Sequence, residues 1–273
     1  MWRDDTARGA DPSERGREIL ESTARGSILR APMRLETLAT ALDVAARAAD
    51  ALAALLARRP EAVLLLPAGA TPVPLYAEVV RRVRAGTLDL SRAHLFQLDE
   101  LVGVGPRDPR GFQAFFREHL VTPLGLETRF HALDGTARDP AAEIERHRRE
   151  LAALGTVDLV LLGLGQNGHV AFNEPGSRLE DAARVVTLGA KTLEGLRLQF
   201  AGQPCPTRGI TLGLREIAAG QEVVMLVTGA GKQTILARLA HGAPSGDVPA
   251  TLLLAHPGFR LLADRAAAAT LAR

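Results

Sequence analysis

The stretch GLGQNGHVAFNEPG, residues 163–176, places a histidine and a carboxylate in one glycine-rich loop. Glu174 follows His169 by five positions, and three glycines precede the histidine. Glycines let a chain turn tightly and approach a ligand closely, and a histidine beside a carboxylate is a common acid–base unit. The loop therefore predicts proton transfer. A loop-capping histidine beside a solvated glutamate remains an alternative on the residues alone.

The first six residues of this stretch also fit G-x-G-x-x-G, the pattern of a dinucleotide-binding turn. Such a turn opens a helix whose first amides bind the pyrophosphate. Pro175 follows Gly168 by seven positions and lies inside the helix that this pattern requires. Proline there removes a hydrogen bond and clashes with the preceding turn. We therefore reject a dinucleotide site.

Short apolar runs alternate with helical segments after Pro60. Runs that are apolar on both faces are typical of strands covered by helices on both sides. The sequence thus predicts an α/β fold, a doubly wound, mostly parallel sheet with helices on both faces, which is Rossmann-like but does not bind a dinucleotide. The predicted strands are residues 62–66, 93–98, 157–162, 222–227, 251–254 and 260–263.

The segment before Pro60 divides into two parts. Residues 1–32 are polar and offer little apolar surface to bury, which predicts a mobile N-terminal extension. From Leu35 to Arg59 apolar residues recur at spacings of three and four, which predicts one helix with a buried face that includes Leu38 and Leu42. Residues 33–273 are expected to form a single domain.

Residues that could bind a ligand or transfer protons follow four of the predicted strands. In parallel sheets of this kind, ligands bind outside the carboxyl ends of the strands. We therefore expect the four segments to meet at one edge of the sheet. The residues concerned are Gly69, Thr71, Asp99, Glu100, His169, Glu174, Gly231 and Lys232.

The composition excludes several classes of protein. The net charge is +2 and the arginines are scattered, which argues against nucleic acid as a partner. No apolar run reaches the roughly 18 residues that span a bilayer, and the N-terminus lacks the apolar core of a secretory signal. We expect a cytoplasmic protein that does not contact a membrane. Of the 33 basic residues only Lys191 and Lys232 are lysines, so each is a candidate for a role that needs a compact ammonium.

Several stretches resemble, in the same order, the motifs of the glucosamine-6-phosphate deaminase family. GLGQNGHVAFNEPG resembles the signature loop, LLLPAGATPVPLY the sugar-phosphate loop, HLFQLDELVGV the Asp-Glu strand end, and MLVTGAGK the segment with a phosphate-binding lysine. The resemblance implies conversion of an aminosugar 6-phosphate into fructose 6-phosphate and ammonia without a metal or an organic cofactor. The resemblance is compatible with a homo-oligomer.

The resemblance also implies catalytic roles. Asp99 corresponds to the base that removes the C2 proton of the sugar. His169 corresponds to the group that passes a proton to and from the ring oxygen, and Glu174 to the carboxylate that orients it. Many members carry Asp where this chain has Asn167, so the charge near the imidazole differs.

For the phosphate group, the resemblance points to a turn and two cations. Gly69, Ala70 and Thr71 correspond to the turn whose backbone amides bind the anion, and Lys232 corresponds to the phosphate lysine. A cation is disfavoured at a helix N-terminus unless an anion is present, which supports this role for Lys232. Arg197 is nearest to an arginine that meets the phosphate in the family, one position out of register.

Three other functions remain open at this stage. A galactosamine-6-phosphate deaminase would differ only in contacts at C4 of the sugar. A 6-phosphogluconolactonase shares the Gly-His loop but continues into a Ser-Leu-Phe-Pro type sequence, where this chain reads Phe-Asn-Glu-Pro over residues 172–175. A sugar-phosphate sensor without catalysis is the third alternative.

Overall fold

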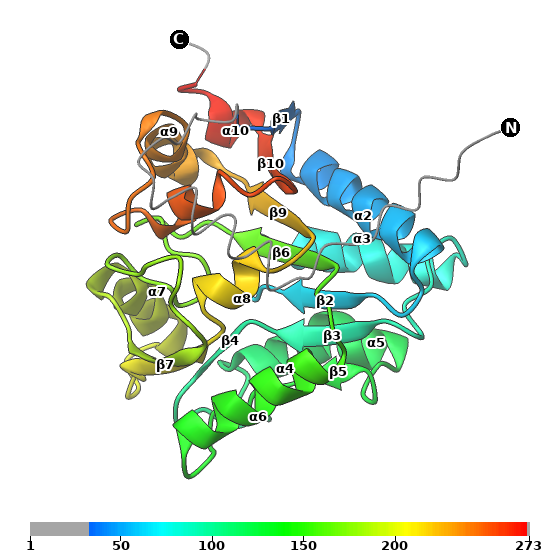
Figure 1. The fold of residues 1–273 in the computed structure, drawn as a ribbon, viewed down its shortest axis with the longest axis vertical. Helices are drawn as coiled ribbons and strands as arrows, with labels where there is room; N and C mark the ends of the chain where they lie inside the picture. Colours follow the sequence, from blue (N-terminus) through cyan, green and yellow to red (C-terminus); the bar gives the residue numbers. More distant parts are fainter. Residues whose placement is uncertain (1–32, 272–273) are drawn as a thin grey trace, which may run out of the picture.

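The computed structural model describes residues 33–271, so the predicted extension over residues 1–32 lies outside the described part (Figure 1). A sheet of seven parallel strands forms the centre. In spatial order the strands are β1 (Leu35–Leu38), β10 (Phe259–Asp264), β9 (Glu222–Val227), β6 (Leu159–Gly163), β2 (Val63–Leu66), β3 (His94–Gln97) and β5 (Phe130–His131).

Helices cover both faces of this sheet, because successive strand residues pack into two different cores. Leu64 and Leu66 belong to one core, whereas Val63 and Leu65 belong to the other. The prediction of a doubly wound sheet is therefore confirmed. The first core includes residues of α2 (Ala41–Arg58), α3 (Val73–Arg84), α4 (Phe112–Phe116), a π-helical turn (Arg117–Val121) and α5 (Thr122–Leu124), and the second includes residues of α6 (Pro140–Ala153), α8 (Leu214–Ala218), α9 (Gln233–His241) and α10 (Arg265–Ala268).

A smaller antiparallel sheet lies beyond the carboxyl ends of the central strands. It contains β4 (Asp99–Leu101), β8 (Arg208–Thr211) and β7 (Arg184–Thr187), and α7 (Ala190–Phe200) follows β7 (Figure 1). The chain passes from β3 through the buried Leu98 directly into β4. A third apolar cluster, which includes Leu101, Phe172 and Leu196, holds α7 against this sheet.

The predicted helix over residues 35–59 is wrong at its start. Residues 35–38 form the edge strand β1, which pairs in parallel with β10. Helix α2 starts at Ala41, because Thr40 and Asp43 form a capping box in which each side chain accepts from the backbone N–H of the other. Leu42, predicted to be buried, is 71% exposed.

Two further predicted elements differ. Residues 249–253 form a 3-10 turn that starts with Pro249, instead of a strand over 251–254. Short buried apolar runs fit a strand and a helical turn equally well, and here Thr251 accepts the Ser245 N–H with its hydroxyl and so closes a loop. The helix expected near residues 111–120 is divided into α4 and the π-helical turn.

The chain reverses its direction across the sheet between β2 and β6. From β2 it proceeds to β3 and β5 on one side, and from β6 to β9 and β10 on the other. The loops that leave β2 and β6 therefore diverge and leave a crevice at the carboxyl edge. Among the described residues, no helix is long and apolar enough to cross a membrane.

We predict that Leu161→Ala lowers the free energy of unfolding by about 3 kcal/mol, because it removes buried apolar contacts and leaves a cavity in the core. Leu161 is 1% exposed and lies in the middle of β6. The exposed Leu42→Ala is the matched control, with an expected change within about 0.5 kcal/mol. Urea titration of both variants measures the difference, and similar losses would contradict the packing described for α2.

Candidate functional site

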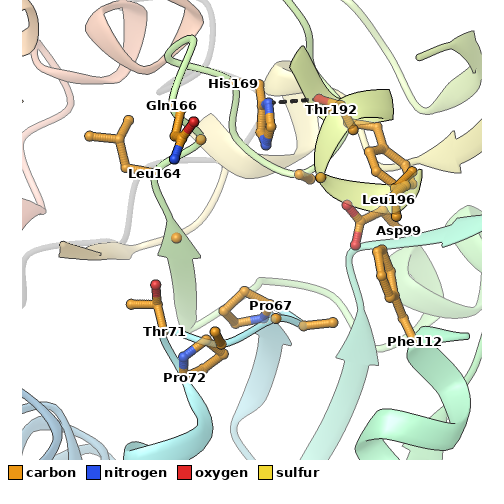
Figure 2. A pocket seen from close by; sticks show the side chains of 18 of the residues that line it. Pro67, Thr71, Pro72, Asp99, Phe112, Leu164, Gln166, His169, Thr192 and Leu196 are labelled. Atoms are coloured by element: carbon orange, nitrogen blue, oxygen red, sulfur yellow. Dashed lines mark hydrogen bonds between the residues drawn. The ribbon is translucent and has the colours of Figure 1, made fainter. Parts of the chain in front are cut away.

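A cavity of about 660 Å³ lies at the carboxyl ends of β9, β6, β2 and β3 (Figure 2). Its volume is in the range of small-molecule sites. The loops that follow these four strands line it, and α7 closes one side. The lining includes Gly69, Ala70, Thr71, Asp99, Gly165, Gln166, His169, Lys191, Thr192, Leu196, Thr228 and Lys232.

The loop after β2 forms a turn suited to an anion. Gly69 has a φ of +111°, in the left-handed region that favours glycine. The Tyr76 hydroxyl, on α3, donates to the Pro67 carbonyl at 2.7 Å and ties the loop to the helix. The first turn of α3 contains no acidic side chain. The positive end of the helix dipole therefore remains available at the cavity. Pro72 and Pro74 have no N–H and the Val73 N–H donates to the Ala70 carbonyl, so the backbone amides offered to an anion are those of the turn at residues 69–71.

Lys232 brings a positive charge to this cavity from the loop after β9. Its Nζ donates to the Leu164 carbonyl at 2.6 Å, which ties the loop after β9 to the loop after β6. Burial lowers the pKa of Lys232. Within residues 33–271, no carboxylate lies at ion-pair distance from this ammonium. A partly buried cation without an anionic partner fits a site that receives an anionic ligand.

Asp99 and its neighbour Glu100 have different environments. Glu100 is 1% exposed, and its carboxylate accepts from Gln97 Nε2 and from the backbone N–H groups of Leu101, Phe112 and Gln113. Glu100 thus holds the start of α4 in place. Asp99 lines the cavity. Burial and the charge of Glu100 raise the pKa of Asp99 well above its usual range, so its carboxylate is unusually basic.

His169 and Glu174 lie on opposite limbs of the loop after β6 and face each other. His169 Nδ1 is 3.6 Å from Glu174 Oε2 and 3.2 Å from the Thr192 hydroxyl oxygen. Burial opposes ionisation of Glu174, but the polar groups of His169, Thr192 and Asn167 around it lower its pKa to about 2. Glu174 is therefore an anion in any neutral solution, behind an imidazole that faces the cavity.

Asn167 and Gly189 fix the position of this carboxylate. Asn167 Nδ2 donates to Glu174 Oε2 at 2.8 Å, and the Gly189 N–H donates to Oε1 at 3.1 Å. A side chain at Gly189 would lie 2.8 Å from Oε2, and one at Gly165 would lie 2.5 Å from the His169 ring. These two glycines are therefore required because the backbone packs directly against the carboxylate and the imidazole.

The glycine pattern of this loop does not open a helix. The chain from residue 164 to residue 183 contains no helical residue. A dinucleotide-binding turn would need a helix here, so this agrees with the rejection of such a site. Instead the buried Asn173 donates to the carbonyls of Val170 and Leu212 and accepts from Arg184. Phe172 packs against Phe112, with ring centroids 5.6 Å apart. The Phe-Asn pair anchors the loop, and Glu174 follows it.

The structure brings most of the predicted site residues together. Asp99, His169, Lys232 and the residues Gly69, Ala70 and Thr71 line one cavity, and Glu174 and Asn167 lie behind His169. Arg197 differs, since it is exposed on α7 and is not part of the cavity lining.

Three residues of α7 were not predicted to lie at the site. Thr192 reaches His169, and Lys191 and Glu194 line the cavity while they form an ion pair with each other at 2.7 Å. The scarcity of lysine singled out Lys191 together with Lys232, but Lys191 follows none of the four strands that were expected to form the site. No local pattern identifies Thr192, because its contact depends on how α7 packs.

The chain is similar to known proteins over most of its length. The sequence pattern of glucosamine-6-phosphate isomerases/6-phosphogluconolactonase matches residues 36–261. A glucosamine-6-phosphate deaminase of Streptomyces avermitilis is 39% identical over 226 residues, 82% of this chain and 87% of the relative. A monomeric glucosamine-6-phosphate deaminase of known structure has a TM-score of 0.84 at 29% identity, over 87% of this chain and 99% of that chain. A 6-phosphogluconolactonase from Leishmania guyanensis, with a TM-score of 0.70 at 21% identity over 87% of this chain and 98% of that chain, shares the fold.

We predict that Asp99→Asn raises the melting temperature, and that the gain is larger at pH 8 than at pH 5. The raised pKa means that, above the unfolded value of about 3.9, the folded protein binds the proton more tightly than the unfolded chain does. The contribution of Asp99 to stability therefore falls as the pH rises, and Asn lacks this dependence.

Thermal unfolding at both pH values measures the effect, with Asp108→Asn as the control of opposite sign. Hydrogen bonds from the side chain and the backbone of Arg110 lower the pKa of Asp108 to about 2. Its replacement should therefore reduce stability at pH 8. A gain for Asp99→Asn that does not depend on pH would contradict the environment described for this carboxylate.

Proposed function

Because the chain belongs to the family of glucosamine-6-phosphate isomerases and 6-phosphogluconolactonases, we propose that it converts glucosamine 6-phosphate and water into fructose 6-phosphate and ammonia. One observation carries the proposal. A basic carboxylate, an imidazole backed by a carboxylate, and an anion-binding turn with a lysine line the same cavity. The family's other activity, hydrolysis of a lactone, removes no proton from a sugar carbon and so does not need a strongly basic carboxylate beside the sugar.

Binding of the substrate starts from its phosphate. The turn at Gly69, Ala70 and Thr71 supplies backbone amides and the N-terminus of α3, and the Lys232 ammonium supplies a full positive charge. A dianion between these groups gains both hydrogen bonds and Coulomb energy. With the phosphate held there, the sugar extends toward Asp99 and His169 on the other side of the cavity (Figure 2).

Ring opening is the first chemical step. A proton leaves the anomeric hydroxyl and a proton reaches the ring oxygen, so one group that accepts and returns a proton serves both transfers. His169 has this capacity, and Glu174 stabilises the imidazolium that forms in between. The product of this step is an open-chain amino aldehyde.

Isomerisation then requires removal of the proton at C2, and Asp99 is the base. Its raised pKa favours abstraction from a weakly acidic C–H group. The resulting enolamine is protonated at C1 and becomes an imine at C2. Water adds to this carbon and ammonia leaves, so one water is consumed and the ketose phosphate remains. In this scheme the cell uses the enzyme for aminosugar catabolism in the cytoplasm.

Two alternatives are disfavoured by particular residues. The Phe-Asn-Glu-Pro segment places Glu174 behind His169, whereas a lactonase sequence would read Ser-Leu-Phe-Pro here. A sensor without catalysis has no use for an ionised Glu174 behind a cavity-facing imidazole. Galactosamine 6-phosphate differs only at C4 and is retained as a second substrate to be tested.

We predict that the purified protein releases ammonia from glucosamine 6-phosphate and that Asp99→Asn lowers kcat by about 10²- to 10⁴-fold, the usual contribution of a general base. A coupled ammonia assay with both epimers measures this. Asp50→Asn, an exposed charge paired with Arg82 on the outer helices, is the control. Ammonia from neither epimer would favour the sensor, and hydrolysis of 6-phosphogluconolactone would favour the lactonase.

We predict that Lys232→Met raises KM for the sugar phosphate by about 10- to 100-fold, since a hydrogen bond between charged groups contributes about 1.5–3 kcal/mol. Lys232→Arg keeps the charge and should recover part of the loss. Steady-state kinetics with glucosamine 6-phosphate and with unphosphorylated glucosamine separates the effects. A similar loss for both sugars would contradict a phosphate role for Lys232.

A further inference from the structure

The imidazole of His169 has a hydroxyl at hydrogen-bond distance, in addition to the carboxylate behind it. Thr192 Oγ1 lies 3.2 Å from His169 Nδ1, within hydrogen-bond distance (Figure 2). Glu174 Oε2 lies 3.6 Å from the same nitrogen, which is too long for a good hydrogen bond. The hydroxyl is thus the group that makes the direct contact with the ring.

The charge of Glu174 determines the direction of this hydrogen bond. Glu174 Oε2 lies 3.6 Å from the same nitrogen, and this carboxylate favours a proton on Nδ1. With the proton on Nδ1, the imidazole donates and the Thr192 oxygen accepts. A neutral imidazole with its proton on Nδ1 has a free Nε2.

The nearby Asn167 does not perform this task. Its Oδ1 accepts the backbone N–H of His169 at 3.2 Å, and its Nδ2 donates to Glu174 Oε2 at 2.8 Å. Both groups are engaged away from the ring. The Gly189 N–H holds the other oxygen of Glu174. The carboxylate is therefore anchored 3.6 Å from Nδ1, and Thr192 Oγ1, at 3.2 Å, is the closer of the two groups to that nitrogen.

We propose that Thr192 is a positioning residue that selects the Nδ1-protonated form of His169 and so presents a free Nε2 to the sugar. The inference rests on the proposed function, because ring opening requires a nitrogen that accepts a proton. With the other tautomer, Nε2 would already carry a proton and could not accept the one from the anomeric hydroxyl.

The position of Thr192 links the tautomer of His169 to the packing of α7. His169 and Glu174 belong to the loop after β6, whereas Thr192 lies in the first turn of α7. Leu196, on the same helix, lines the cavity and packs in the third apolar cluster. The proton on the imidazole is therefore placed correctly only when α7 is packed over the cavity.

The test compares Thr192→Val, which keeps the shape and removes the hydroxyl, with Thr192→Ser, which keeps the hydroxyl. We expect Thr192→Val to lower kcat about tenfold with little change in KM, equivalent to the loss of about one hydrogen bond. Thr192→Ser should remain within about threefold of the parent, a smaller effect than loss of that hydrogen bond. Thr37→Val, on the exposed side of edge strand β1, is the matched control.

Long-range ¹H–¹⁵N NMR of the imidazole nitrogens gives a readout that does not depend on turnover. The His169 signals, assigned by their loss in His169→Gln, should show Nδ1 protonated in the parent and in Thr192→Ser. In Thr192→Val the Nε2-protonated form should gain population. An unchanged tautomer in Thr192→Val, or a serine variant as impaired as the valine variant, would overturn the proposal.

The two proposals fail in different ways. If the parent releases no ammonia but the tautomer depends on the Thr192 hydroxyl, the proposed function fails and the positioning role stands as a property of the site. If the parent is active and Thr192→Val keeps both kcat and the tautomer, the positioning role alone fails.

Discussion

The reversal of the chain between β2 and β6 is the constraint on which the site depends. Both strands are buried on both faces, so their polar loops can emerge only at the sheet edges. Because the next connections run to opposite sides, the loops at the carboxyl edge separate and leave space between them. The turn at Gly69 and the loop with His169 border that space, and the ends of β3 and β9 add Asp99 and Lys232.

Three carboxylates near this crevice show how environment assigns different roles to one functional group. Glu100 and Glu174 each accept several hydrogen bonds that fix their positions. Glu174 stays ionised because its pKa is lowered, whereas burial raises the pKa of Glu100 despite its donors. Asp99 is buried beside Glu100, and among the described residues no hydrogen bond to its side chain is found. A carboxylate without donors holds its proton strongly, and this property suits a base and not a structural anchor.

The second sheet and α7 add the upper wall of the cavity. Asp99 starts β4 and so is placed by the antiparallel pairing with Thr211 of β8 as well as by the end of β3. The close approaches at Gly165 and Gly189 bring the His169 ring and the Glu174 carboxylate against backbone. A side chain at either glycine would displace the groups that transfer protons, so local chain geometry and chemistry are coupled here.

Sequence reasoning determined the features that depend on local signals. The buried strands β2, β3, β6 and β9 follow from apolar runs, and the site residues Asp99, His169 and Lys232 follow from their positions after predicted strands. The resemblance to the family motifs added the expected roles of these residues. Even so, Thr40 and Asp43 form a local capping signal that the apolar spacing obscured, and β1 was missed for this reason.

Only the tertiary structure decided which side chains meet. The pairing of β1 with β10 joins opposite ends of the described chain, and no local pattern specifies it. The packing of α7 turns Thr192 toward His169 and leaves Arg197 exposed on the same helix. Helical spacing determines which residues share a face, whereas the direction of that face is set by the apolar contacts that the helix makes with distant segments.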